Sequence, residues 1–161
     1  MPQVAFDQLP PDARLWIFPA SRALNDDERR RVIAEADTFI AQWMAHGVPL
    51  TAARDLRYNQ FVLVGVNERA AGVSGCSIDA LVRRMDHLGR EIGVDLVDNA
   101  PVQFRQGDAI RRVSRDEFFD LAAKGGVDLD TVVFDNTVTR VGDIDRWEVP
   151  ARQAWHGRTF F

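Results

Sequence analysis

The apolar run Phe61-Val62-Leu63-Val64-Gly65-Val66 constrains the fold most strongly, because its short length and its β-branched residues are typical of a buried strand. The residues from Pro49 to Tyr58 are more weakly strand-like, and Asn59-Gln60 is a candidate turn between the two segments. The sequence therefore predicts a hairpin that leads into a central strand.

Helical patterns flank this hairpin on both sides. Asn25, with Glu28 three residues later, predicts an N-cap with a capping box, and Gly47 stands at a C-cap position, so we expect a helix over about 26–46. A second stripe of apolar residues at helical spacing predicts another helix that ends near Gly93; the stripe comprises Ile78, Leu81, Val82, Met85, Leu88 and Ile92.

Shorter strand patterns complete the topology. Leu15–Phe18 precedes the first helix, and Val102–Arg105 follows the second. The order strand, helix, strand, strand, helix, strand predicts an α+β fold with a ferredoxin-like βαββαβ core, in which a mostly antiparallel sheet carries the helices on one face. Strand 109–113, a helix capped by Ser114 and strand 131–134 predict a C-terminal strand–helix–strand extension.

The length and composition indicate one globular domain over residues 1–161. With 161 residues and 46% hydrophobic content, the chain is long enough for one substantial core and short for two ordinary domains. The tail from Asp143 to Phe161 is too aromatic to be a disordered extension, so we expect it to pack back on the domain.

Charge and cysteine content argue against several classes of partner. A formal net charge of −4, without a basic cluster, argues against a surface that binds nucleic acid. No leader pattern and no apolar run of about 20 residues is visible, so we expect a cytoplasmic protein without a membrane partner. One cysteine and three histidines at unrelated spacings predict neither a metal site nor a cofactor.

Several motifs together resemble a small uncharacterised family of bacterial proteins of similar length. The likeness spans nearly the whole chain, and it is carried by Trp43–Leu50, Arg57–Phe61, Ser74–Asp79, Trp147–Pro150 and Trp155–Arg158. Some members carry the label "ABC transporter ATPase". A phosphate-binding P-loop requires G-x-x-x-x-G-K-[ST], whereas Lys124 is followed by Gly125 and lacks the upstream glycine. The resemblance therefore implies no established activity.

The only cysteine of the chain, Cys76, stands at the expected start of the second helix. Ser74 and Ser77 are candidate helix caps, and Gly75 lets a ligand approach the backbone closely. Unpaired amides and the positive end of the helix dipole favour a thiolate or a bound anion at such a position.

Two features of this segment leave its role open. Asp79, which we expect in the first helical turn, disfavours a second negative charge beside it. Cysteine is also among the most buried residue types. Cys76 is therefore interpreted as a structural residue, as a ligand contact or as a nucleophile. The long loop before it is interpreted either as a surface loop or as part of a site.

A second set of residues is basic and aromatic. If the tail folds across the start of the second helix, His156 and Arg158 can bind an anion together with the amides of Ser77 and Ile78. The alternative is that the tryptophans are core residues and the arginines form surface ion pairs. The other members of the set are Trp43, His46, Arg54, Arg57, Tyr58, Trp147 and Trp155.

Three functions follow from these patterns. The first is a domain that binds a small anionic ligand at the helix start, through Ser74, Gly75, Cys76, Ser77, Arg57 and Arg158. The second is an enzyme that uses Cys76 in thiol or acyl chemistry, with His156 as a further candidate catalytic residue. The third is an interaction module, including a homodimer, that docks through the aromatic tail.

Overall fold

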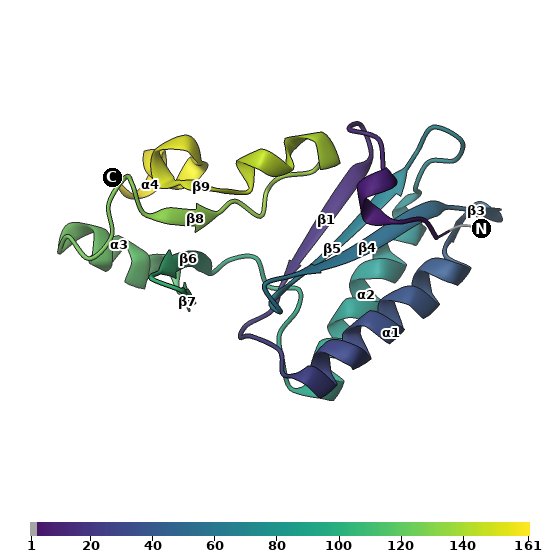
Figure 1. Cartoon of the computed structure of the whole chain (residues 1–161), viewed down its shortest axis with the longest axis horizontal. Coiled ribbons are helices and arrows are strands. Elements are labelled where there is room, and N and C mark those ends of the chain that lie inside the picture. Colours follow the sequence, from purple (N-terminus) through teal and green to yellow (C-terminus); the bar gives the residue numbers. More distant parts are fainter. Residues whose placement is uncertain (1–2) are drawn as a thin grey trace. The chain divides into compact units, whose positions relative to one another are not determined.

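The computed structural model describes residues 3–161 and divides them into two compact units (Figure 1). Unit 1 comprises the chain up to Val97 together with Thr139–Gly142, and unit 2 comprises Asp98–Val138 and Asp143–Phe161. The expectation of a single domain over residues 1–161 stays a prediction.

Unit 1 is built on a three-stranded antiparallel sheet in the order β1-β5-β4. Its strands are β1 (Arg14–Pro19), β4 (Thr51–Arg57) and β5 (Phe61–Asn67). The central strand β5 is buried from its first residue to Val66, and it pairs with β1 on one side and with β4 on the other. The predicted hairpin is therefore confirmed.

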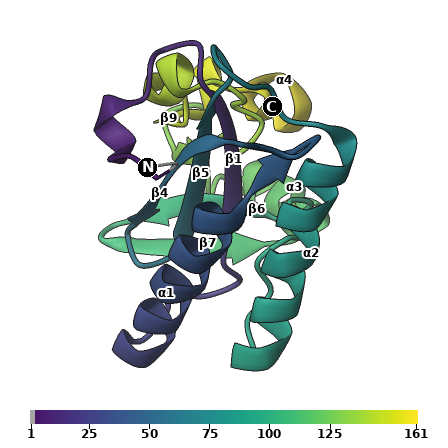
Figure 2. The same ribbon diagram turned by 90° about the vertical axis from the view of Figure 1, so that its right-hand side faces the viewer.

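Helices α1 (Asp26–Gln42) and α2 (Gly75–Ile92) lie side by side on one face of this sheet (Figure 2). The Asn25 side chain accepts from the Glu28 amide at 2.8 Å, and the Glu28 carboxylate accepts from the Asn25 amide at 3.0 Å, which confirms the predicted capping box. The core between helices and sheet includes Val32, Ile40, Val62, Val64, Leu81, Met85 and Leu88.

The first helix ends at Gln42, and the prediction of a helix up to residue 46 is wrong. A small hairpin of β2 (Met44–Ala45) and β3 (Val48–Pro49) follows it. The intervening residues His46 and Gly47 both have positive φ values, 52° and 77°, as a two-residue turn of type I′ requires. Gly47 serves this turn and does not cap the helix.

The second helix is long and amphipathic, and its outward face is charged. Asp86 pairs with Arg90 at 3.1 Å, and His87 with Glu91 at 2.5 Å, each one helical turn apart. Gly93 ends the helix in the left-handed conformation, as expected. Within residues 3–161, no helix combines the length and apolar character needed to cross a membrane.

The opposite face of the sheet in unit 1 is covered by segments from two distant parts of the chain. The N-terminal segment, with the 3-10 helix η1 (Phe6–Gln8), packs Leu9 and Ala13 against Ala53 of β4, and Val141 joins them. The Leu15 amide donates to the Thr139 carbonyl at 2.9 Å, and the Gly142 amide donates to the Pro11 carbonyl at 2.8 Å. Residues 139–142 are thus an integral part of unit 1.

Unit 2 is a four-stranded antiparallel sheet in the order β7-β6-β8-β9. Phe118 of α3 is fully buried, and its ring lies 5.4 Å from that of Phe104 and 4.9 Å from that of Phe160. The elements are β6 (Val102–Gln106), β7 (Ala109–Val113), α3 (Arg115–Ala123), β8 (Val132–Phe134), the 3-10 helices η2 (Val141–Arg146, which begins in unit 1) and η3 (Ala151–Gln153), β9 (Glu148–Pro150) and α4 (Trp155–Phe160).

The protein is therefore α+β with antiparallel sheets, as predicted. The strand that was expected to complete the first sheet, 102–105, exists as β6 but pairs with β7 and β8 in the sheet of unit 2. The short loop at Gly107-Asp108 places β7 directly beside β6, and closing such a local hairpin costs little chain entropy. The expected strand–helix–strand extension is present as β7, α3 and β8.

Candidate functional site

The start of α2 is fixed by two serines that cap it reciprocally. The Ser74 hydroxyl accepts from the Ser77 amide at 3.1 Å, while the Ser77 hydroxyl accepts from the Ser74 amide at 2.7 Å and donates to the Ser74 carbonyl at 2.8 Å. Ser77 is buried although it is polar, since these bonds satisfy its hydroxyl. The predicted capping role of Ser74 and Ser77 is confirmed.

The first turn of α2 carries no acidic residue. Because the helix begins at Gly75, Asp79 falls in the second turn, and its predicted place in the first turn is wrong. A capping box commonly has Glu or Gln at the position that Ser77 occupies here. With the neutral Ser77, the first turn of α2 has no negative side chain of its own to offset the helix dipole, and the Glu68 carboxylate accepts a hydrogen bond from the Val73 amide just before the N-cap at 3.0 Å.

An open pocket of about 440 Å³ lies over this helix start. The end of α1, the β2–β3 hairpin and the first turns of α2 contribute its walls, all within unit 1. Most of its surface is apolar or aromatic, and Ser74 and Cys76 bring the helix start into it. Its lining residues are Phe39, Gln42, Trp43, Met44, His46, Ser74, Cys76, Ser77 and Ala80.

Trp43 joins the two sides of this pocket. Its indole Nε1 donates to the Ser77 carbonyl at 2.9 Å in a buried hydrogen bond. Its ring packs against Phe39, at a centroid distance of 5.3 Å, and against Trp16 at 6.0 Å. Trp43 is therefore both a core residue and the element that fixes the hairpin wall against the start of α2.

Cys76 and His46 line the same pocket, and both are exposed. In the described chain no hydrogen bond joins the two side chains. The structure brings together Cys76 and a histidine, but this histidine is His46 of the hairpin turn. No spacing in the sequence could link two residues from such distant elements. His46 lies in the motif Trp43–Leu50, and Cys76 lies in the motif Ser74–Asp79.

The predicted site residue Arg57 lies away from this pocket. It pairs with Phe61 at the closed end of the β4–β5 hairpin, whereas α2 follows the opposite end of β5. At about 3.3 Å per residue, the two ends of this strand are about 20 Å apart. The Arg57 guanidinium instead pairs with Asp55 at 3.0 Å.

Arg54 is likewise engaged in an ion pair, with Asp37 of α1, at 2.8 and 3.1 Å. The hydrogen bond from this guanidinium holds the pKa of Asp37 below its ordinary value, and a hydrogen bond from Gln3 acts in the same direction. Arg54 therefore ties α1 to β4, in agreement with the surface-pair interpretation.

The tail candidates His156 and Arg158 belong to α4 of unit 2. His156 is 1% exposed, and burial lowers its pKa to about 4. Arg158 is exposed on the same short helix. The expectation that these residues meet the start of α2 stays a prediction.

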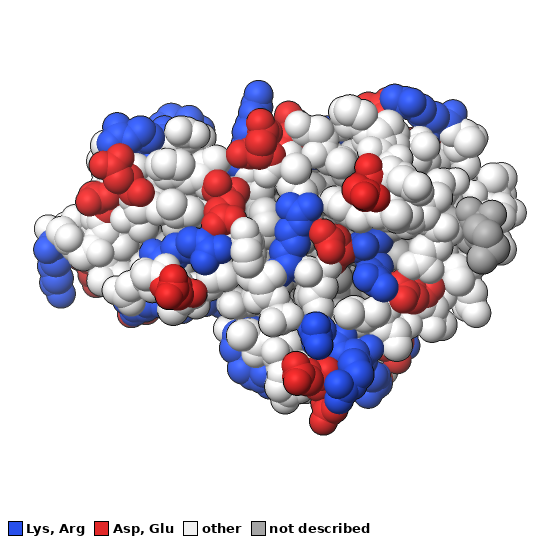
Figure 3. Space-filling model, in the orientation of Figure 1, with Lys and Arg blue, Asp and Glu red and all other residues white. Residues whose placement is uncertain are grey.

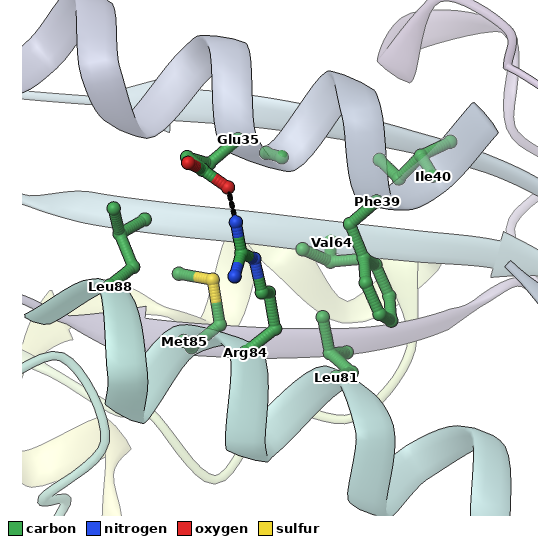
Figure 4. A pocket seen from close by; sticks show the side chains of 9 residues that line it. Glu35, Phe39, Ile40, Val64, Leu81, Arg84, Met85 and Leu88 are labelled. Carbon is green, nitrogen blue, oxygen red and sulfur yellow. Dashed lines mark hydrogen bonds and ion pairs between the residues drawn. The ribbon is translucent and has the colours of Figure 1, made fainter. Parts of the chain in front are cut away.

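A second, closed hollow lies between α1 and α2 (Figure 4). Apolar side chains such as Phe39, Leu81 and Met85 line it, and the ion pair between Glu35 and Arg84 lies across it. Its volume of about 10 Å³ is at the lower limit for one water molecule. This hollow is a packing gap and not a ligand site.

Charges on the surface are mixed in sign, and on the face drawn in Figure 3 basic and acidic side chains are interspersed. Several arginines have acidic partners, such as Arg152 with Asp130 at 2.7 Å. Across residues 3–161, no group of three or more His, Cys, Asp or Glu side chains is arranged to hold a metal ion.

Comparison with known proteins adds no relative. No protein-family model, curated protein or solved structure matches this chain. The resemblance that the motifs indicate stays a prediction, and the function is argued from the geometry of the pocket over α2.

Proposed function

We propose that unit 1 binds a small molecule with one anionic group, whose charge lies on the first turn of α2. The observation that carries this proposal is the neutral serine capping box, which leaves a first helical turn without an acidic side chain facing an open pocket of about 440 Å³. The helix itself supplies no acceptor for the amides of Gly75 and Cys76. These two donors, with the helix dipole, favour a carboxylate or phosphate.

The pocket walls favour a ligand with an apolar body. Phe39, Trp43 and Met44 offer aromatic and thioether surface beside the helix start, and Met44 is 51% exposed. His46 adds an imidazole ring to the same wall of the pocket. The lining contains no arginine or lysine, so a polyphosphate is less well matched than an aromatic or aliphatic monocarboxylate.

The sharpest test places a charge in the first turn without altering the pocket. A side chain at Gly75 meets nothing within 4 Å, so Gly75→Asp and its uncharged isostere Gly75→Asn are both accommodated. Asp in a first turn stabilises a helix by roughly 0.3–1 kcal/mol, but it repels an anion at the same amides. Gly75→Asp is therefore expected to be stable and yet to bind the anion more weakly.

The measurement is ¹H–¹⁵N NMR titration with benzoate, hexanoate and phenyl phosphate, and with neutral benzamide as the uncharged control. Saturable shifts of the amides of Gly75–Ser77 are expected for wild type and Gly75→Asn, with at least tenfold weaker binding to Gly75→Asp. Arg57→Ala, at the far end of the sheet, is expected to bind as wild type does. No saturable shift with any anion, or equal binding by the Asp and Asn variants, would refute the proposal.

A Cys76-dependent enzyme is the second proposal, and the shared pocket of Cys76 and His46 supports it. Iodoacetamide labelling over pH 5–9 tests it, with His46→Gln as the matched variant. A nucleophile activated by His46 labels faster than the denatured chain below pH 7, and the variant loses this advantage. Identical pH profiles for native and denatured protein would contradict the proposal.

Docking through the aromatic tail is the third proposal. Trp147 and Phe160 are buried within unit 2, whereas the terminal Phe161 is 45% exposed. A homodimer through this end predicts a mass twice that of the chain in light scattering, and Phe161→Ser is expected to reduce the dimer fraction. A monomer at all accessible concentrations would remove this proposal.

We also propose that unit 1 is a ferredoxin-like core without its fourth strand. The order strand, helix, strand, strand, helix supports this, as do the placement of β1 beside β5 and the two helices on one face of the sheet. The strand that would complete such a core along the chain is β6.

A further inference from the structure

The C-terminal helix α4 of unit 2 is held by packing rather than by its own sequence. It spans Trp155–Phe160, its N-cap Ala154 makes no side-chain hydrogen bond, and its first turn contains no acidic residue. A helix of this length is not stable alone in water. His156 and Phe160 are the buried residues through which it docks.

The docking surface is an aromatic cluster around the imidazole. The His156 ring stacks on Trp155 at 4.0 Å and lies 6.4 Å from Phe118 of α3 and 6.3 Å from Phe160. Its Nδ1 is buried and has no hydrogen-bond partner within the described chain. A neutral imidazole tolerates this setting, whereas an imidazolium would leave a charged N–H donor buried among rings without an acceptor.

The backbone of α4 also lies close to η3 at Gly157. A Cβ at Gly157 would lie 2.6 Å from the Ala151 carbonyl oxygen of η3. The backbone of α4 therefore packs directly against η3, and the helix cannot move further toward η3 to give the imidazole a new partner. Relief of a buried charge requires the helix to leave.

The charged groups around His156 do not offset this cost. Asp135, in the turn after β8, favours the imidazolium, and Arg115, in the first turn of α3, opposes it. Arg115 lies over the Trp155 ring at 4.9 Å, and η3 presents Ala151 to the cluster while its Arg152 pairs with Asp130. Burial is the largest effect, and it lowers the pKa of His156 to about 4.

From this geometry we propose that α4 is an acid-released latch, docked while His156 is neutral and freed when it is protonated. The docked state binds the proton more weakly than the free helix does, so docking is strongest above the ordinary histidine pKa of 6.5 and weakens as the pH falls toward 4. From well above pH 6.5 to well below pH 4, the equilibrium constant for docking falls roughly 300-fold. Release exposes Phe118, Trp155 and Phe160.

Hydrogen exchange of the full chain, analysed by mass spectrometry at pH 7.5 and 5.0 and corrected for intrinsic rates, tests this proposal. The linkage predicts that protection of the 155–161 peptide falls about 30-fold between these pH values. Peptides of α2 in unit 1 and of β6 in unit 2 serve as internal references and are expected to keep their protection.

Two variants separate the titration from packing. His156→Phe retains an aromatic ring, and His156→Leu covers the case in which the larger ring does not fit; in either, protection of the 155–161 peptide should be independent of pH. His87→Gln, at an exposed histidine of α2, is the matched control and should behave as wild type does. Unchanged wild-type protection at pH 5.0, an equal loss in the His156 variants, or a simultaneous loss throughout unit 2 would overturn the latch.

Discussion

Gly89, in the last turn of α2, gives a prediction whose sign is opposite to that expected from sequence alone. Replacing an interior helical glycine by alanine ordinarily stabilises a helix by about 1 kcal/mol. At Gly89, however, a Cβ would lie well under 3.0 Å from the Val94 carbonyl oxygen, and 3.4 Å from the backbone nitrogen of Leu96. The Val94 amide donates to the Gly89 carbonyl at 2.9 Å, which holds this backbone in place.

The expected magnitude follows from these contacts. Overpacking of a rigid site costs about 1–3 kcal/mol, and a Cβ this close to a backbone oxygen belongs in the upper half of that range, which outweighs the gain in helix propensity. We expect Gly89→Ala to lower the free energy of unfolding of unit 1 by about 1–2 kcal/mol, or the melting temperature by about 2–8 °C. Gly75→Ala, in the same helix but with nothing within 4 Å of its Cβ, is the matched control and should be neutral or stabilising.

Urea and thermal unfolding followed by circular dichroism give the stability of both variants. Hydrogen exchange of the α2 peptides assigns the change to unit 1. If Gly89→Ala were as stable as Gly75→Ala, the close approach of residues 94–96 to α2 would be wrong, and so would the reasoning from it.

Two further predictions concern the contacts of α1 and its C-terminal end. Trp43→Phe keeps an aromatic ring but removes part of the buried indole and its hydrogen bond to the Ser77 carbonyl, so urea unfolding should show a loss of about 1–3 kcal/mol, and the ligand-induced NMR shifts should weaken. Asp37→Asn should cost less than about 1 kcal/mol at pH 7, because its pair with Arg54 is partly solvated. Since the folded pKa of Asp37 is lowered, its contribution is present above the ordinary value and is lost below it; the variant and wild type should converge as the pH falls below about 4. A difference that grows toward low pH would contradict this assignment.

Features determined by neighbouring residues were predicted well. The Asn25–Glu28 capping box, the β4–β5 hairpin and the serine-capped start of the second helix depend on residues within a few positions of one another. The end of α1 was not predicted, because Trp43 and Met44 continue the helical apolar spacing although Trp43 is extended. Their apolar character serves the pocket wall and the hairpin instead.

The sequence indicated only one wall of the pocket. The segment containing Cys76 was a candidate, but its opposite wall comes from Trp43 and His46, and the bond that joins the walls links residues 34 positions apart. No local pattern specifies such a pairing. The partner of β6 was missed for a related reason, since the strand signal at Val102 does not indicate which sheet it joins.

The return of residues 139–142 to the first sheet bears on how this chain reaches its native state during synthesis. The Leu15 amide and the Pro11 carbonyl find their partners in a segment made after the Asp98–Val138 part of unit 2, and Val141 completes the cluster around Leu9. A nascent chain that ends near Val97 therefore lacks a part of its own first unit. Unit 1 can finish folding only after the ribosome has passed Gly142, and a truncated product cut at the boundary between the units would lack the contact of Val141 with the cluster around Leu9.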